Sequence, residues 1–307
     1  MNVKQAVLLY NSREASNDRI SNSESFDNAL QYIQSKHAEC NYPVTTIILS
    51  YNHEKYIQRA IQSVLSQKGN FIHRIIISDD GSFDTTPCII NKFREKYPEK
   101  IIDLSSPDNL GFSKNLKKCI EESDAEYIAI CEGDDYWNDD FKLQKQIEFF
   151  TAHPTCSMVF SAVKVLNNSN GRFRQLSRQK NLTKNLLTGT DFLSHKSMNL
   201  IANYSSCLFK KSILMELPDY AFAVRLNEIA MAFFCEKFGK IGYLEQPMSV
   251  YRQHEGGLWT GKNRIEQLKS GLIGRKLAYK LASHLYKPSI QKRIEVDYET
   301  PLRKMRG

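Results

Sequence analysis

Three carboxylates stand within four positions of the chain, at Glu132, Asp134 and Asp135, directly after an apolar run. Acids so close together repel one another, so outside bulk water they need a cation if all are to stay ionised. Hard divalent ions such as Mg²⁺ and Mn²⁺ prefer oxygen ligands, and an ion held by one or two carboxylates keeps other positions open for a diphosphate. A solvated acidic turn after a strand is the alternative interpretation of the same residues.

The segments around these acids alternate between two patterns. From residue 43 onward, apolar runs typical of buried strands alternate with stretches whose apolar residues recur at helical spacing. Strands are predicted at 44–50, 72–78, 100–104 and 126–131, and helices at 54–67, 84–97 and 112–123. Such alternation predicts an α/β fold with a mostly parallel sheet that helices cover on both faces.

Polar residues follow three of these strands at the points where the strands end. Ser50, Tyr51 and Asn52 follow the first strand, residues 79–82 follow the second, and residues 132–135 follow the fourth. Ligands of open α/β sheets bind beyond the carboxyl ends of the strands. We therefore expect these polar groups to meet at one edge of the sheet.

The second half of the chain is less regular. It predicts a helix at 141–152, a strand at 157–166, a polar loop at 167–190, mixed structure at 203–209, a helix at 228–238 and a short strand at 241–244. Because the segment 167–190 is polar and basic, we expect it to be mobile.

Composition narrows the class of protein. The 307 residues, 41% of them hydrophobic, suffice for one large or two small domains. No stretch approaches the roughly 18 consecutive apolar residues of a membrane-spanning helix, and the first residues lack a signal-peptide pattern, so we expect a cytoplasmic protein. The seven cysteines are scattered without a CxxC pair, which argues against a disulfide framework and against a zinc site.

Four ordered stretches, taken together, resemble the family 2 glycosyltransferases, which have the GT-A fold. The stretches are VTTIILSYNHEKYIQRAIQSVLSQ, RIIISDDGSFDTT, NLGFSKNLKKCIEESDAEYIAICEGDDYW and GKIGYLEQPMSVYRQHEGGLW. Motifs in this order are more specific than any one of them alone. The resemblance implies an inverting hexosyl- or N-acetylhexosaminyltransferase that uses a nucleotide-sugar, in particular a UDP-sugar, together with Mn²⁺ or Mg²⁺. It also suggests a hydroxyl acceptor on a cell-surface polysaccharide or lipooligosaccharide.

The resemblance divides the chain into three parts. Residues 1–42 form an N-terminal extension, 43–261 form the GT-A domain, and 262–307 form a basic helical tail. Within the GT-A domain, 43–140 is the half that binds the nucleotide and 141–261 is the acceptor half.

The resemblance also implies roles for individual residues. The nucleotide-sugar would contact Ser50, Tyr51, Asn52, Glu54, Asp80, Gly111, Lys114, Glu132, Asp134 and Asp135. Asp134 matches the second acid of the metal-binding DxD motif, and His254 follows a pattern in which a histidine approaches the metal or the diphosphate. The longer Glu132 stands where the first acid of the motif would be Asp. As a purely local alternative, the 79–82 segment is a tight turn that needs Gly81.

The acceptor half supplies the expected catalytic base. Counting back from Gly239 places Glu228 at the family position of the base, where Asp is commoner, and Glu236 is the alternative. An acid in a first helical turn is also what the helix dipole favours. Trp137, together with Tyr136 and Trp259, is expected to stack on acceptor sugars or else to pack in the core.

Two other functions are compatible with parts of this pattern. A nucleotidyltransferase that makes sugar nucleotides shares an α/β architecture, but it would need a Gly-rich basic phosphate loop near the N-terminus, which the chain lacks. A sugar-nucleotide-binding protein with weak or lost catalysis is the other alternative, because Glu132 and Glu228 stand where Asp is common.

The net charge of +8 is concentrated in the tail. Residues 262–307 carry twelve Lys and Arg against four acids, and no nucleic-acid-binding motif accompanies them, so we expect no nucleic-acid partner. An apolar stripe runs from Leu268 to Leu285 among basic residues. The stripe could pack on the catalytic domain or on a second subunit of a homodimer. Alternatively, the tail rests on the anionic inner face of a membrane and brings the active site to a lipid-linked acceptor.

Overall fold

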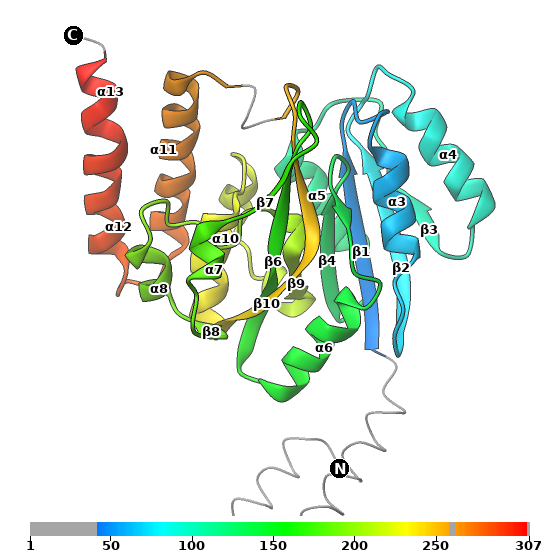
Figure 1. Cartoon of the computed structure of the whole chain (residues 1–307), viewed down its shortest axis with the longest axis horizontal. Helices are drawn as coiled ribbons and strands as arrows, with labels where there is room; N and C mark the ends of the chain where they lie inside the picture. Colours follow the sequence, from blue (N-terminus) through cyan, green and yellow to red (C-terminus); the bar gives the residue numbers. More distant parts are fainter. Residues whose placement is uncertain (1–41, 258–261, 306–307) are drawn as a thin grey trace, which may run out of the picture. The chain divides into compact units, whose positions relative to one another are not determined.

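The computed structural model of the protein describes residues 42–257 and 262–305, and a mixed β-sheet with helices on both faces forms its centre (Figure 1). Four parallel strands in the order β3-β2-β1-β4 form one half of this sheet. They are β1 (Tyr42–Ser50), β2 (Phe71–Asp79), β3 (Ile101–Asp103) and β4 (Tyr127–Glu132). Each lies where its apolar run predicts a strand. The predicted extension 1–42 lies outside the described residues except for its last residue.

Helices bury the two faces of these strands in separate cores. The helices of this half are α3 (Ile57–Leu65), α4 (Thr86–Lys96), α5 (Phe112–Glu122) and α6 (Lys142–Ala152). Ile48 of β1 packs in the core that contains residues of α3, α4 and α6, whereas Ile47 packs in the core of α5. Because neighbouring residues of one strand face opposite cores, nearly every position of β1 is apolar or buried.

The second half of the sheet contains longer strands with mixed directions. It comprises β6 (Cys156–Asn167), β9 (Cys207–Lys210), β10 (Lys240–Gln253) and the short β5 (Tyr136–Trp137). Strand β9 joins the halves by pairing antiparallel with β4 and β6, and β10 pairs parallel with β6. The prediction of a strand confined to 241–244 is therefore wrong. Pro247 interrupts the apolar pattern there, but the chain absorbs it in a β-bulge and pairing resumes at Ser249.

The segment 167–190 is more ordered than its polar composition predicts. It contains β7 (Phe173–Gln175), α7 (Ser177–Lys180), β8 (Leu186–Leu187) and the start of α8 (Gly189–Ser194). Strand β7 pairs with β6, and β8 pairs with β10. Gln179 is buried, and its side chain bonds the Val163 N–H and the Leu200 and Ile201 carbonyls. A polar residue thus holds this segment to the sheet, so the expected long loop is corrected.

Helices complete the C-terminal third. They are α10 (Glu228–Cys235), α11 (Arg264–Leu281), α12 (Lys287–Ile294), the π-helical segment η4 (Glu295–Glu299) and α13 (Thr300–Lys304). The short segments η1 (Tyr204–Ser206), α9 (Lys211–Leu214), η2 (Asp219–Phe222) and η3 (Glu236–Phe238) connect the larger elements. In Figure 1, α11, α12 and α13 lie together at the side of the molecule away from β3.

The apolar stripe of the tail packs within this chain. Leu268, Leu277 and Leu281 of α11 are buried, and α11 packs on α10. Ile273 and Leu285 are 49% and 68% exposed. Of the two readings of the stripe, packing on the catalytic domain is the one that the structure describes. Within residues 42–257 and 262–305, no helix is both long enough and apolar enough to cross a membrane.

Candidate active site

The carboxyl ends of β1, β2 and β4 bring the predicted polar groups to one edge of the sheet. Ser50 pairs with Asp79 in the β1–β2 register, and Leu49 pairs with Glu132 in the β1–β4 register. The groups that follow the three strands are therefore neighbours. This arrangement follows from parallel pairing, in which the strands of a sheet end on the same side.

The loops after β1 and β2 are joined by Asn52 and Glu54. Asn52 has a left-handed backbone conformation (φ 54°), which asparagine tolerates well. Its N–H donates to the Ser82 hydroxyl (2.7 Å), and its side-chain oxygen accepts from the Phe83 N–H (2.9 Å). Glu54 accepts hydrogen bonds from the N–H and the hydroxyl of Thr85. Both residues thus fix the shape of the loops where we expect the nucleotide.

Asp80 fixes the turn that precedes α5. Its two carboxylate oxygens accept hydrogen bonds from the N–H groups of Leu110 (2.8 Å) and Gly111 (2.9 Å), and the side chain is 5% exposed. Gly111 has φ 80°, a conformation that suits glycine. Lys114 is exposed in the first turn of α5. The carboxylate of Asp80 retains lone pairs, but its present partners are backbone groups.

Ser50 and Tyr51 differ in exposure. The Ser50 hydroxyl is buried and has no hydrogen-bond partner in the described part of the chain. Tyr51 is 39% exposed. A buried hydroxyl without a partner is uncommon and suits a group that bonds a ligand.

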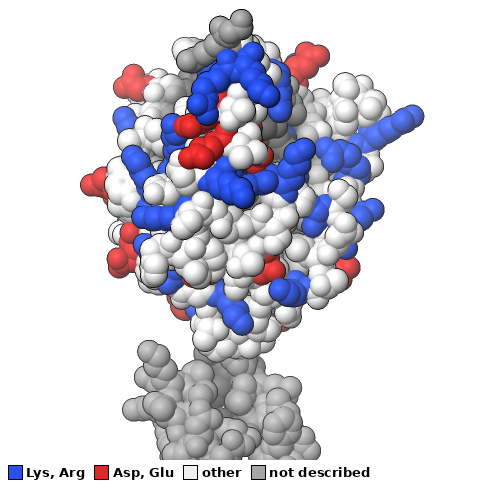
Figure 2. All heavy atoms as spheres, turned by 90° about the vertical axis from the view of Figure 1, so that its left-hand side faces the viewer, with Lys and Arg blue, Asp and Glu red and all other residues white. Residues whose placement is uncertain are grey.

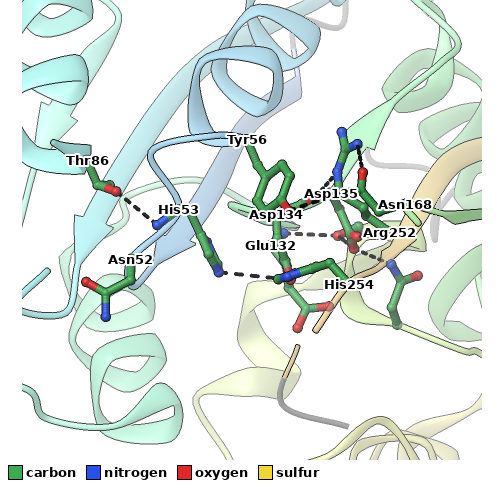
Figure 3. Close-up of polar contacts among 12 residues, drawn as sticks. Asn52, His53, Tyr56, Thr86, Glu132, Asp134, Asp135, Asn168, Arg252 and His254 are labelled. Carbon is green, nitrogen blue, oxygen red and sulfur yellow. Dashed lines mark hydrogen bonds and ion pairs between the residues drawn. The ribbon is translucent and has the colours of Figure 1, made fainter. Parts of the chain in front are cut away.

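Asp134 is the carboxylate that meets two histidines (Figure 3). Its Oδ2 lies 3.1 Å from His254 Nε2 and 3.9 Å from His53 Nε2, and its carbonyl oxygen accepts from Arg252 Nε at 2.9 Å. Burial favours the neutral acid, but the hydrogen bond from His254 and the charges of both histidines outweigh it and lower the pKa of Asp134. The chemistry of Asp134 is thus that of an anion poised for a cation.

Gly133 allows this approach. A Cβ at Gly133 would lie 2.8 Å from His53 Nδ1 and 2.9 Å from the Leu49 carbonyl oxygen. Any larger residue would push apart the loop after β1 and the acids after β4. Glycine is needed at this position for close packing, because the His53 ring lies directly against its backbone.

Glu132 shares its surroundings with Asp134 and Glu228. Burial raises the pKa of Glu132 to about 8, and the charges of Asp134 and Glu228 raise it while Arg225 opposes them. Arg225 Nη2 lies 3.7 Å from Glu132 Oε1. Glu132 therefore contacts Arg225, three residues before α10, and interacts through charge with Asp134 and Glu228.

Asp135 does not have the role that we expect from the resemblance. It is 1% exposed, and its oxygens accept from the Arg252 N–H (2.9 Å), the Ser205 hydroxyl (2.7 Å) and the Asn203 side-chain amide. Its carboxylate is thus directed into the protein, where it joins β10 and η1 to the loop after β4. We correct its assignment from a nucleotide-sugar ligand to a structural residue, because three donors of the protein already occupy its two oxygens.

Glu228 opens α10 at the other side of the site. The Asn227 side chain caps this helix by accepting from the Ala230 N–H at 2.9 Å. Burial raises the pKa of Glu228, and the nearby positive charges of Arg225, Arg178 and Arg275 act against it. A raised pKa suits a carboxylate that must take up a proton near neutral pH.

The alternative base, Glu236, is engaged elsewhere. It lies just beyond the opposite end of α10, where its Oε1 accepts from the Tyr286 hydroxyl at 2.5 Å. This bond holds α12 to η3. The placement favours Glu228 over Glu236 as the base.

The aromatic residues after β4 are buried. Trp137 is 4% exposed, and its Nε1 donates to the Ser205 carbonyl at 2.7 Å. Tyr136 is 5% exposed, with the Arg59 guanidinium over its ring at 3.7 Å. We correct the acceptor-stacking role expected for both in favour of core packing, because neither ring offers a free face. Trp259 lies outside the described residues.

Two residues near the acids escaped the sequence-based assignment. His53 follows Asn52 in the first quoted stretch, and Arg252 precedes His254 in the last. Arg252 is 9% exposed and lies over the rings of Tyr56 and Tyr136 at 4.8 and 5.4 Å. Their positions beside assigned residues were the available signal, but only the folded structure shows that they contact Asp134.

The ligand set for a divalent ion is small. Among the described residues, no group of three or more His, Cys, Asp or Glu side chains is arranged to hold a metal by itself. Asp134 Oδ2 and His254 Nε2, 3.1 Å apart, offer one oxygen and one nitrogen. Neighbouring ligands of an octahedral ion at about 2.1 Å are about 3 Å apart, so this pair fits an ion that takes its other ligands from a diphosphate and water.

Curated relatives of the chain include bacterial glycosyltransferases. The poly-beta-1,6-N-acetyl-D-glucosamine synthase of Staphylococcus epidermidis is 26% identical over 249 residues, which are 80% of this chain and 58% of that protein. An uncharacterized protein of Mycobacterium tuberculosis is 29% identical over 223 residues, which are 70% of this chain and 60% of that protein. This chain thus spans about 60% of the length of these relatives.

Solved structures share the fold. TarS of S. aureus in complex with UDP-GlcNAc aligns with a TM-score of 0.58 at 18% identity, over 82% of this chain and 70% of TarS. The mannosyltransferase PcManGT from Pyrobaculum calidifontis in complex with GDP-Man and Mn²⁺ aligns with a TM-score of 0.61 at 16% identity, over 90% of this chain and 79% of PcManGT. The GT-A fold expected from the resemblance is confirmed.

The family model described as glycosyl transferase family 2 matches residues 45–216, which is more than half of the chain. This match includes Ser50, Asp80 and Asp134, which lie at or just after the ends of β1, β2 and β4. The chain belongs to glycosyl transferase family 2.

Proposed function

We propose that the protein transfers a sugar, with inversion and with help from a divalent ion, from a UDP-sugar to a hydroxyl group of a glycan acceptor. One observation carries this proposal. Arg225 Nη2 lies 3.7 Å from Glu132 Oε1, so the start of α10, which carries Glu228, approaches the acids that follow β4. The proposed base and the acids that would hold the metal ion and the diphosphate are therefore parts of one site.

The donor side is provided by the ends of β1, β2 and β4. Asn52, Glu54 and Asp80 shape the loops that would bind the nucleoside, and the Ser50 hydroxyl is available as a donor to the ligand. The solved structures with UDP-GlcNAc and with GDP-Man support a nucleotide-sugar ligand for this fold. We favour UDP as the nucleotide part of the donor, as the resemblance implies.

Asp134 and His254 are the residues that would hold Mn²⁺ or Mg²⁺. When bound, the ion would neutralise negative charge on the departing diphosphate. His53 and Arg252 position Asp134 from two sides. Arg252 fixes the main chain of Asp134 and His53 lies beside its carboxylate, so Asp134 is oriented before any substrate binds. Electrostatic catalysis depends on preorganisation of this kind.

Glu228 performs the proton transfer in this mechanism. Its carboxylate accepts the proton of the acceptor hydroxyl, whose oxygen forms a bond to the anomeric carbon. The bond from that carbon to the diphosphate oxygen breaks, and its electron pair leaves with the nucleoside diphosphate. Because the attack and the departure occur on opposite faces, the anomeric configuration inverts. General-base assistance of this kind typically contributes 10²–10⁴-fold in rate.

The acceptor that we propose is a lipid-linked glycan of the cell surface at the inner face of a membrane. A relative named as a poly-beta-1,6-N-acetyl-D-glucosamine synthase supports a polysaccharide product. Figure 2 looks onto the face with the C-terminal helices, where Lys and Arg side chains stand out. The exposed basic residues of the tail are Arg264, Lys269, Lys276, Lys280, Lys292, Arg303 and Lys304. Because the leucines of α11 are buried, the membrane contact proposed here is electrostatic.

The direct test is the anomeric configuration of the product. The protein is incubated with Mn²⁺ and α-linked UDP-sugars, and released or transferred sugar is followed by ¹H NMR from the first turnovers, before mutarotation. The proposal expects a β-configured initial product and loss of turnover with EDTA. A product with the configuration of the donor, or turnover that EDTA does not affect, would contradict it.

A further inference from the structure

The charges of two arginines outside the transfer mechanism, Arg178 and Arg225, act on the proposed base, and a third arginine, Arg174, precedes Arg178 by four residues. Arg174 belongs to β7, Arg178 to α7, and Arg225 to the segment before α10. The charges of Arg178 and Arg225 both act on Glu228, and the charge of Arg174 acts on Arg178. Positive charge therefore gathers around the point where an acceptor hydroxyl must meet its base.

The sheet register places this cluster beside the proposed metal ligands. Arg174 pairs with Val165 of β6, and Val165 pairs with Tyr251 of β10, three residues before His254. Arg174 Nη2 also donates to the Gln253 side-chain oxygen at 3.4 Å. The polar segment expected to be a loop thus brings Arg174 beside the residues that precede His254, and Arg178 follows it in α7.

Arg178 is the least satisfied member of the cluster. It makes neither a hydrogen bond nor a salt bridge with the described residues, and its Nε is buried without a partner. Burial, and then the charge of Arg174, lowers the pKa of Arg178. A buried guanidinium N–H without an acceptor is unfavourable, and a second guanidinium nearby adds repulsion. Both effects are relieved by an anion placed between them.

Arg225 differs from the other two arginines because an acid lies beside it. Its guanidinium lies over the Phe112 ring at 4.7 Å and 3.7 Å from Glu132, so it is partly neutralised by the acid of the donor half. In the part of the chain that the structure describes, neither Arg174 nor Arg178 has a carboxylate within salt-bridge distance, and Glu228 acts on Arg178 only through its charge. The unneutralised charge therefore lies on the β7–α7 side of the base.

We propose that Arg178, assisted by Arg174, binds an anionic group of the acceptor, so that the glycan substrate carries a carboxylate or a phosphate near the hydroxyl that reacts. This inference rests on the proposed function. A planar guanidinium fork matches two oxygens of either group, which gives orientation as well as affinity. Arg178 is then a specificity-determining residue, because it fixes the acceptor while Glu228 takes the proton.

A competing role for Arg178 is to keep Glu228 ionised. That role predicts no preference for anionic sugars, since it acts through the base and not on the ligand. Binding measured without turnover separates the two. The protein is saturated with UDP and Mn²⁺, which fill the donor side, and is titrated by calorimetry with sodium glucuronate, glucose 6-phosphate and glucose at constant ionic strength.

We expect at least one of the two anionic sugars to bind wild type about tenfold or more tightly than glucose, as one charge-assisted contact would give. Comparing glucuronate with glucose 6-phosphate shows whether a carboxylate or a phosphate is preferred. Arg178→Gln should abolish the preference, and Arg174→Gln should reduce it. Arg172→Gln is the matched control, because Arg172 is an exposed arginine of the same hairpin and should leave the preference intact.

Equal binding of anionic and neutral sugars by wild type, no binding of any of them, or a preference that persists in Arg178→Gln would overturn the inference. Failure of the proposed function has a different signature. In that case UDP with Mn²⁺ does not bind, and the same sugar titration on the protein alone still decides whether Arg178 selects an anion.

Discussion

The donor and acceptor sides of this site differ in how their charged groups are satisfied. On the proposed donor side, Asp80 and Asp135 accept hydrogen bonds of 2.7–2.9 Å from backbone and side-chain donors. On the acceptor side, Glu228 and Arg178 interact mainly through charge, and Arg178 has no hydrogen bond within the described residues. The difference suggests a rigid donor side built for one kind of ligand and an acceptor side whose charges await the substrate.

Of the changes that test this difference, Asp134→Asn should reduce turnover the most. Removing the charge weakens the grip on a divalent ion and on the diphosphate, so turnover should fall by about 10²–10³-fold or more while the protein stays folded. Turnover is measured across a Mn²⁺ titration, with circular dichroism as the control for folding. If Asp134→Asn turned over as fast as wild type at low Mn²⁺, Asp134 would not act through a metal.

Asp135→Asn should affect folding rather than chemistry alone. An amide NH₂ in place of one oxygen would face donors, so the free energy of unfolding should drop by about 1–3 kcal/mol. Urea unfolding of Asp135→Asn and Asp134→Asn compares neighbouring positions with the same chemical change. If Asp134→Asn is the less stable of the two, the division between a structural and a ligand-binding acid is wrong.

The pH dependence of kcat tests the role of Glu228 on the acceptor side. Because the pKa of Glu228 is raised above 4.5 and the base must be unprotonated, kcat should fall with decreasing pH through a value above 4.5. The charge of Arg225 lowers this pKa, so Arg225→Gln should move the acid limb to higher pH. A limb that stays in place or moves to lower pH would remove Glu228 from the step being measured.

The smallest expected effect concerns the tail. Each Lys or Arg close to an anionic bilayer contributes about 1 kcal/mol, and salt screens this attraction. Sedimentation with anionic vesicles should therefore show binding that weakens as salt rises and that Lys269→Gln with Lys292→Gln reduces. Neutral vesicles are the control, and equal binding to both kinds would leave α11 with its packing role only.

The elements that could be predicted from sequence are those with local signals. Strands β1, β2 and β4 are runs of buried residues, and α3 has apolar residues at helical spacing, so each lies where it is expected. Helix α4 begins near Pro87, as a proline in a first turn predicts. The acids at 132–135 could be recognised from sequence for the same reason, because they directly follow the apolar run of β4.

The role of individual acids could not be predicted, because it depends on distant partners. Asp135 is enclosed by Asn203, Ser205 and Arg252, which are 68, 70 and 117 positions away. In the same way, Gln179 is a polar residue in a polar segment, and only its bonds to distant backbone groups order α7. Composition therefore indicated a loop where the structure has β7, α7 and β8.

The identity of the base tests the central claim most directly. Single-turnover rates and donor affinity are compared for wild type, Glu228→Gln and Glu236→Gln, two isosteric changes at opposite ends of one helical segment. The account predicts that Glu228→Gln lowers the rate about 10²–10⁴-fold with donor affinity little changed, and that Glu236→Gln stays within a few-fold of wild type. An active Glu228→Gln beside an inactive Glu236→Gln would contradict it.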